Sequence, residues 1–262
     1  MRTNRLQGAV LKQMTAPIRL ALEARAPWEH GVMFAARPLL SMAPKGDGHP
    51  VLVLPMMLGS DLSTLPLRSF IAGRSYAAST WDQGLNLGPR SGVFVTCLER
   101  LRALRRSYGR RVSLVGWSLG GLFARALALE APDDVRLVIC LGTPISADPA
   151  PEKIWRLYQR FTGDSMGLPD HLTGLNRPLP VPSTSIFSRS DGILSWQDSV
   201  EPRGPSGESI EVESSHLGLG VHPLALYAIA DRLAQPEGQW RPFDRNGLLS
   251  WLYPDPERKG WF

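Results

Sequence analysis

The chain has 262 residues, of which 43% are hydrophobic, and its formal net charge is +5. This composition is apolar enough for a large core and excludes intrinsic disorder as the default state. No stretch approaches the roughly 18 apolar residues that a membrane-spanning helix requires, and the N-terminus lacks the continuous apolar segment of a secretory leader, so we expect a soluble, cytoplasmic protein.

The first part of the chain predicts a helical extension followed by a buried strand. Residues 1–48 interleave apolar side chains with Arg, Glu and Ala, which is typical of helices, and turn formers at 43–50 end this extension. The short apolar run 51–55 predicts a buried strand. A helix over 62–73 and a second strand over 75–81 are expected next.

The middle of the chain alternates between helices and strands. Apolar residues recur at helical spacing over 91–108, with arginines on the other side. The run 111–116 predicts a strand, 119–130 a helix and 135–142 another buried strand. This alternation favours an α/β fold, with a mostly parallel central sheet flanked by helices.

Residues 145–182 interrupt the alternation. They contain six prolines and are too short for an independent core, so we interpret them as an insertion that forms a cap or lid within a single domain. Strands are expected at 183–188 and 209–214, and a final helix at 222–235. The tail, 236–262, is rich in aromatic residues.

The segment VSLVGWSLGG contains a G-x-S-x-G motif at Gly116, Ser118 and Gly120. It lies between a predicted strand and a predicted helix, where a sharp turn exposes a serine hydroxyl above the sheet. Small residues on both sides allow neighbouring elements to approach, so Ser118 is the candidate nucleophile. The alternatives are a glycine-rich turn with Ser118 as an N-cap, or a dinucleotide site, whose G-x-G-x-x-G spacing is absent.

A serine hydroxyl needs a base to accept its proton, and in enzymes with this motif the acid and then the histidine follow the serine. Three histidines follow Ser118: His171, His216 and His222. His171 lies in the insertion, and His222 begins a helix, where capping is a plausible role. His216 directly follows the last strand, at the sheet edge where catalytic groups gather, so it is the candidate base.

Asp191 is the candidate acid. It follows the strand before that of His216, and an aspartate there can hold the imidazole of His216 in one tautomer. Gly192 suits a turn that directs the carboxylate inward. The alternatives are a local turn role for Asp191, or Asp198 as the acid.

Two backbone N–H groups are candidates for an oxyanion hole. One belongs to Leu119, directly after the serine, and the other to Met57 in the loop after the first strand, with Met56 as the second choice for that loop. Each such donor contributes roughly 10²–10³ in rate. The alternative for both methionine side chains is plain apolar packing.

Five segments in this order, VLVLPMMLGSD, GWSLGG, LGTP, SRSDGIL and SSHLGLG, resemble bacterial lipases and esterases of the α/β-hydrolase superfamily over roughly residues 45–235. The resemblance implies ester hydrolysis through an acyl-enzyme, with no metal or other cofactor, under a lid formed by 145–182. Related sequences often have a glycine where this chain has Met56, a departure that concerns the oxyanion loop and not the triad.

The leading hypothesis is a serine esterase or lipase acting on a small-molecule or lipid ester. The insertion suggests an apolar acyl pocket, although a lid helix that only packs on the sheet is the alternative. The candidate pocket residues are Met56, Met57, Trp155, Tyr158, Phe161 and Trp196. An acyltransferase or thioesterase would use the same triad with another acceptor or leaving group.

Other classes of function have less support. The basic residues are spread along the chain, and no nucleic-acid-binding module is recognisable. Cys97 and Cys140 lie in apolar runs, as buried free thiols do, and no zinc pattern occurs. A non-catalytic relative that binds a partner or membrane surface through the basic, Trp-rich ends is less favoured, because all three triad residue types occur in the expected order. No sequence feature sets an oligomeric state.

Overall fold

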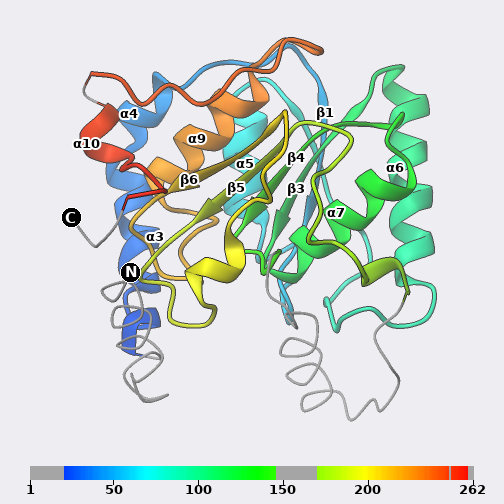
Figure 1. Cartoon of the computed structure of the whole chain (residues 1–262), viewed down its shortest axis with the longest axis horizontal. Helices are drawn as coiled ribbons and strands as arrows, with labels where there is room; N and C mark the ends of the chain where they lie inside the picture. Colours follow the sequence, from blue (N-terminus) through cyan, green and yellow to red (C-terminus); the bar gives the residue numbers. More distant parts are fainter. Residues whose placement is uncertain (1–20, 146–169, 248, 259–262) are drawn as a thin grey trace.

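The computed structural model describes residues 21–145, 170–247 and 249–258. They form a six-stranded sheet with the order β2-β1-β3-β4-β5-β6, and every neighbouring pair is parallel (Figure 1). The strands are β1 (Pro50–Leu54), β2 (Ala77–Ser79), β3 (Val112–Trp117), β4 (Val135–Leu141), β5 (Ser183–Phe187) and β6 (Gly207–Glu211).

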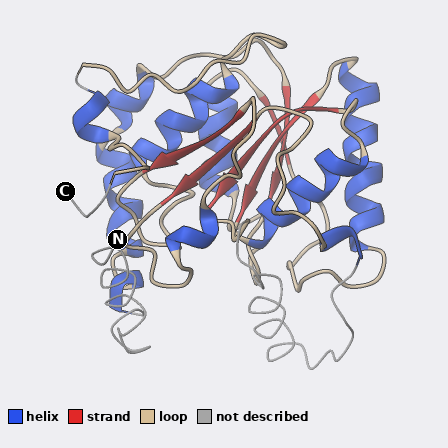
Figure 2. Cartoon of the chain, in the orientation of Figure 1, coloured by secondary structure: helices blue, strands red, loops and turns tan. Residues whose placement is uncertain are grey.

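Helices cover both faces of this sheet (Figure 2). The described helices are α3 (Ala26–Ala35), α4 (Arg37–Ser41), α5 (Leu65–Gly73), α6 (Val93–Tyr108), α7 (Leu119–Glu130), α9 (Pro223–Leu233) and α10 (Leu249–Leu252), with 3-10 turns at η1 (Asp170–Leu172) and η2 (Trp196–Ser199). The fold class expected from the sequence is therefore confirmed.

The strands read as continuous apolar runs because both of their faces are buried. In β1, Leu52 and Leu54 pack with the core of α6 and α7, whereas Val51 and Val53 pack with that of α5 and α9. Side chains alternate between the faces with a period of two. Two apolar cores, one on each face, thus hold the sheet in place.

The strand order determines where a site can form. From β1 the chain passes to β2 on one side, and it returns to β3 on the other side of β1. The loops that follow β1 and β3 therefore diverge, and in open parallel sheets ligands bind outside the carboxyl ends of the strands at such a point. The loops after β5 and β6 end at this same edge, because all the strands are parallel.

Two strands differ from their predicted ranges by two or more residues at an end. The strand predicted over 75–81 contains only Ala77–Ser79, since Ser75 has a positive φ of 65° and β2 lies at one edge of the sheet that the described residues form. The last strand is Gly207–Glu211 rather than 209–214. Beyond it, the N–H groups of Ser214 and Ser215 donate to side chains of Ser188 and Glu29 instead of to a strand.

Most of the predicted cap, 146–169, lies outside the described residues. The described remainder contains η1 and the loop leading to β5. In the tail, Phe243 and Tyr253 are buried, and the Tyr253 hydroxyl donates to the Leu224 carbonyl in α9. Within the described ranges, the helices are too short or too polar to cross a bilayer.

Candidate active site

Ser118 occupies a strained turn between β3 and α7. Its φ is 53° and its ψ is −116°, a conformation that costs a non-glycine residue about 1–3 kcal/mol. The surrounding hydrogen bonds hold this geometry: Ser118 N–H donates to Leu141 O at 2.8 Å, while Gly121 N–H and Thr143 Oγ1 donate to Ser118 O at 2.9 and 3.1 Å. The G-x-S-x-G motif therefore forms the sharp turn that the sequence predicts.

The glycines around Ser118 are required by close packing. A Cβ on Gly116 would lie 2.4 Å from Gly120 O, and one on Gly120 would lie 2.2 Å from Leu54 O. A Cβ on Gly121 would lie 1.9 Å from Thr143 Oγ1. Because most of these neighbours are backbone atoms, they cannot move aside, and only glycine lets α7 begin this close to β1.

Asp191 and His216 form a buried pair at the same edge of the sheet. His216 Nδ1 lies 2.6 Å from Asp191 Oδ2, and both residues are less than 5% exposed. The other carboxylate oxygen of Asp191 accepts the N–H groups of Ile193 and Leu194 at 2.8 and 2.7 Å. These bonds fix the carboxylate, so Nδ1–H of His216 donates to it and the lone pair stays on Nε2.

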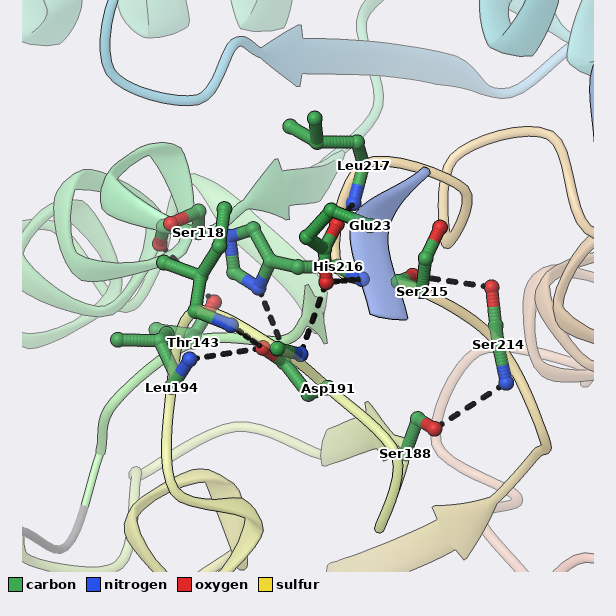
Figure 3. Close-up of polar contacts among 12 residues, drawn as sticks. Glu23, Ser118, Thr143, Ser188, Asp191, Leu194, Ser214, Ser215, His216 and Leu217 are labelled. Carbon is green, nitrogen blue, oxygen red and sulfur yellow. Dashed lines mark hydrogen bonds and ion pairs between the residues drawn. The ribbon is translucent and has the colours of Figure 1, made fainter. Parts of the chain in front are cut away.

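The imidazole of His216 lies between Asp191 and Ser118, with one ring nitrogen toward each (Figure 3). A hydrogen bond joins the turn of Ser118 to the loop of His216: the indole Nε1 of Trp117 donates to the carbonyl of His216 at 3.1 Å. Among the described residues, the Ser118 hydroxyl makes no hydrogen bond to the ring. Catalytic hydrogen bonds often become short only when substrate is bound.

Two opposing effects act on the pKa of His216. Burial disfavours the charged ring and lowers the pKa, while the charge and the hydrogen bond of Asp191, and the charge of Glu23, raise it. The net direction is upward from the ordinary value of 6.5. The site thus favours the imidazolium that forms when a base accepts a proton.

The other candidate histidines lie elsewhere. His171 stacks on Phe94, with ring centroids 4.2 Å apart, and His222 occupies the N-cap position of α9 without a side-chain cap. Burial lowers the pKa of both. Asp198 lies in η2, and the carboxylate that contacts His216 Nδ1 is that of Asp191.

A buried asparagine organises the candidate oxyanion loop. Asn86 Nδ2 donates to Pro55 O, and Leu58 N–H donates to Asn86 O, both at 2.7 Å. Leu58 has a positive φ of 61°, so the loop turns sharply directly after Met57. In the described part of the chain, neither the Met57 N–H nor the Leu119 N–H donates to a protein acceptor.

The side chains proposed for the pocket separate in the structure. Met56 packs against the core on the α9 side of the sheet and Met57 against the core on the α7 side. Trp196 stacks on Phe187 at 5.7 Å and lies 4.1 Å from the guanidinium of Arg189, so its packing role is evident. The remaining three, Trp155, Tyr158 and Phe161, lie outside the described residues.

Sequence reasoning missed four side chains beside the site. They are Glu23, Arg25, Glu29 and Asn86. The three charged ones resemble solvent-facing residues of an amphipathic helix in the sequence, and Asn86 resembles an ordinary loop residue. In the ranges that the structure describes, no three His, Cys, Asp or Glu side chains form a group suited to a metal ion.

Comparisons with known proteins agree with this fold. The family model of the alpha/beta hydrolase fold matches residues 72–198, which contain Ser118 and Asp191. No curated protein matches the sequence significantly. Among solved structures, lipase B of Aspergillus fumigatus is similar, with a TM-score of 0.57 and 14% identity over 72% of this chain and 53% of that one.

Two Mycobacterium tuberculosis proteins are similar as well. One is Rv0554, with a TM-score of 0.53 and 16% identity over 72% of this chain and 90% of the other. The second, BpoC of strain H37Rv, provisionally named a non-heme bromoperoxidase, has the same score and identity over 72% and 92%. Such low identities establish the fold rather than the reaction. The chain therefore has the α/β-hydrolase fold, and it is similar to the family whose model it matches.

Proposed function

We propose that this protein is a serine hydrolase that cleaves carboxylic esters through an acyl-enzyme on Ser118. The observation that supports the proposal most is the buried Asp191–His216 pair, with 2.6 Å between Oδ2 and Nδ1, at the sheet edge where the strained turn presents Ser118. One fold hosts many chemistries, so the proposal depends on this arrangement and not on the fold alone.

The first half of the reaction acylates the serine. His216 Nε2 accepts the hydroxyl proton as Ser118 Oγ bonds to the ester carbonyl carbon, and the carbonyl electrons move to oxygen. The N–H groups of Leu119 and Met57 donate to this oxyanion. The ester C–O bond then breaks, and the imidazolium gives its proton to the leaving alcohol.

The second half uses water in place of the alcohol. The water oxygen attacks the acyl carbon while His216 Nε2 accepts a proton from the water. The bond from the acyl carbon to Ser118 Oγ then breaks, and the imidazolium returns its proton to Oγ. Asp191 stabilises the cationic ring in both halves, and its bonds to Ile193 and Leu194 keep it oriented. No cofactor is needed in this scheme.

The substrate class that we propose is an apolar small-molecule or lipid ester. The predicted cap residues Trp155, Tyr158 and Phe161 would supply the apolar wall. A series of p-nitrophenyl esters from acetate to longer chains tests this point. We expect kcat/KM to rise with chain length, whereas strict preference for acetate would contradict a large acyl pocket.

Ester hydrolysis is tested by comparing the wild type with Ser118→Ala. The control is Ser107→Ala, because Ser107 is exposed near the end of α6. We expect turnover to be lost in the first variant and kept in the second, with both folded by circular dichroism. Full turnover in Ser118→Ala would overturn the proposal.

Adding an alcohol acceptor to the wild-type reaction shows whether acyl transfer competes with hydrolysis.

A further inference from the structure

The N-terminal segment before β1 contacts both loops of the proposed catalytic pair. Glu23, Arg25 and Glu29 come from this segment, more than 160 residues away in sequence from the loops that they contact. Figure 3 shows Glu23 beside His216. These residues precede the part of the chain that the hydrolase family model matches.

Glu23 joins the loop of the acid to the loop of the base. Its Oε1 accepts the N–H of Gly192 at 2.8 Å and the N–H of His216 at 2.9 Å. Its Oε2 accepts the N–H of Leu217 at 2.9 Å. A single carboxylate thus holds the residue after Asp191 and the base itself at fixed positions.

Two neighbours of Glu23 extend these contacts. The guanidinium of Arg25 donates to Ser190 O at 3.1 Å and to Ser190 Oγ at 2.6 Å. Glu29 Oε1 accepts the N–H of Ser215 at 2.9 Å. The residues directly before and after Asp191, and those directly before and after His216, are therefore all bonded to the N-terminal segment.

The burial of Glu23 indicates that these bonds are specific. Glu23 is only 5% exposed. Removing a carboxylate from water is costly unless its oxygens are hydrogen-bonded. Three backbone donors satisfy it, and such charge-assisted bonds are roughly twice as strong as neutral ones. These bonds therefore offset the cost of burying the carboxylate, and they tie the two loops to it.

We propose that Glu23 is a positioning residue that holds Asp191 and His216 in register, so that the N-terminal segment is part of the catalytic site. This inference rests on the proposed function. Glu23 touches no reacting atom in that scheme and acts through the backbone of His216 and Gly192.

Glu23 also acts on His216 electrostatically. Among the residues that the structure describes, the charged groups that raise the pKa of His216 are Asp191, from the loop after β5, and Glu23, from the N-terminal segment. Arg25, Glu29 and Glu213 lie one residue further out, around Ser190 and Ser215. Loss of the Glu23 charge is expected to lower the pKa of His216.

The test is Glu23→Gln in the full chain, with Glu130→Gln as the control. Glu130 is exposed at the far end of α7. We expect kcat to fall by roughly 10- to 100-fold with little change in KM, because small displacements of reacting groups are costly. The acid limb of the pH profile should move to lower pH, and the control should match the wild type.

An NMR titration of the His216 ring separates this inference from the proposed function, since it requires no turnover. A lower pKa in Glu23→Gln supports the positioning role even if Ser118→Ala keeps activity and ester hydrolysis is refuted. If Glu23→Gln does not fold, Glu23→Asp keeps the charge but shortens its reach, and kcat should still fall. A folded variant with wild-type kcat and an unchanged His216 titration would overturn the inference.

Discussion

The indole of Trp117 donates to the carbonyl oxygen of His216 at 3.1 Å, so the residue before the proposed nucleophile directly supports the loop of the proposed base. The ring is only 4% exposed. It packs so closely on Gly220 that a Cβ there would lie 2.5 Å from a ring carbon. The buried side chain of Trp117 therefore helps to set the distance between Ser118 and His216.

Replacing this indole tests the link. In Trp117→Phe the ring still packs near Gly220, but the hydrogen bond to His216 O is lost. We expect kcat to decrease by about 10-fold, because the base loop loses one anchor, and the unfolding free energy to decrease by about 1–3 kcal/mol, because a buried acceptor is left unpaired. Steady-state kinetics and urea denaturation measure the two effects. Equal kinetics for variant and wild type would show that the contact is only structural.

The acid is tested by paired substitutions. Asp191→Asn should lower kcat by roughly 10³–10⁴, because the amide no longer stabilises the imidazolium and permits the wrong tautomer. Asp198→Asn, in η2, should retain most of the activity. Ester turnover measures both variants. The reverse ranking would transfer the role of acid to Asp198.

The pH dependence follows from the raised pKa of His216. His216 accepts a proton only when it is neutral, so kcat/KM should fall as the pH drops through this pKa, above the ordinary 6.5. The free energy of unfolding depends on pH in the opposite sense, because folding favours the charged ring of His216. Its stabilising contribution is complete below the pKa of the unfolded state, and it is lost as the pH rises through the pKa of the folded state. A kcat/KM profile checks the first expectation. A limb well below the ordinary histidine value would contradict it.

A buried ion pair joins α7, the helix that follows Ser118, to the chain after η2. Arg125, in α7, donates to both carboxylate oxygens of Glu201 at 2.7 and 2.8 Å, and both residues are buried. Glu201→Gln leaves the arginine charge without its counter-ion and should cost about 3–5 kcal/mol of unfolding free energy.

The control for that ion pair is Glu257→Gln. Its carboxylate lies 3.6 Å from Arg203, and both side chains are exposed, so the expected loss is about 0–1 kcal/mol. Chemical denaturation measures both variants. If Glu201→Gln and Glu257→Gln lost similar amounts of unfolding free energy, the buried ion pair would contribute no more to stability than the exposed one.

Much of the fold was predictable from local pattern. Buried strands such as β3 and β4 are short apolar runs, and α7 begins after Ser118 and ends before Pro132, as its sequence predicts. Motif order also selected Ser118, Asp191 and His216, two of which the structure joins by a hydrogen bond. Parallel strands end at one edge, so residues that follow different strands meet there.

The supporting contacts were not predictable in this way. Glu23 and His216 are separated by 193 residues, and no periodicity relates an N-terminal helix to a distant loop. Asn86 is likewise an ordinary loop residue until its amide reaches Pro55 O. The end of β6 was misplaced for the same reason, because Ser214 and Ser215 bond to side chains that come from other segments.

The central claim is that Ser118 is a nucleophile activated by His216. Its most direct test is reaction with a fluorophosphonate followed by mass spectrometry of the intact protein and its peptides. We predict one adduct per chain, located on Ser118, formed rapidly by the wild type and very slowly by His216→Ala. An unmodified protein, or an adduct on another residue that forms equally fast without His216, would contradict the claim.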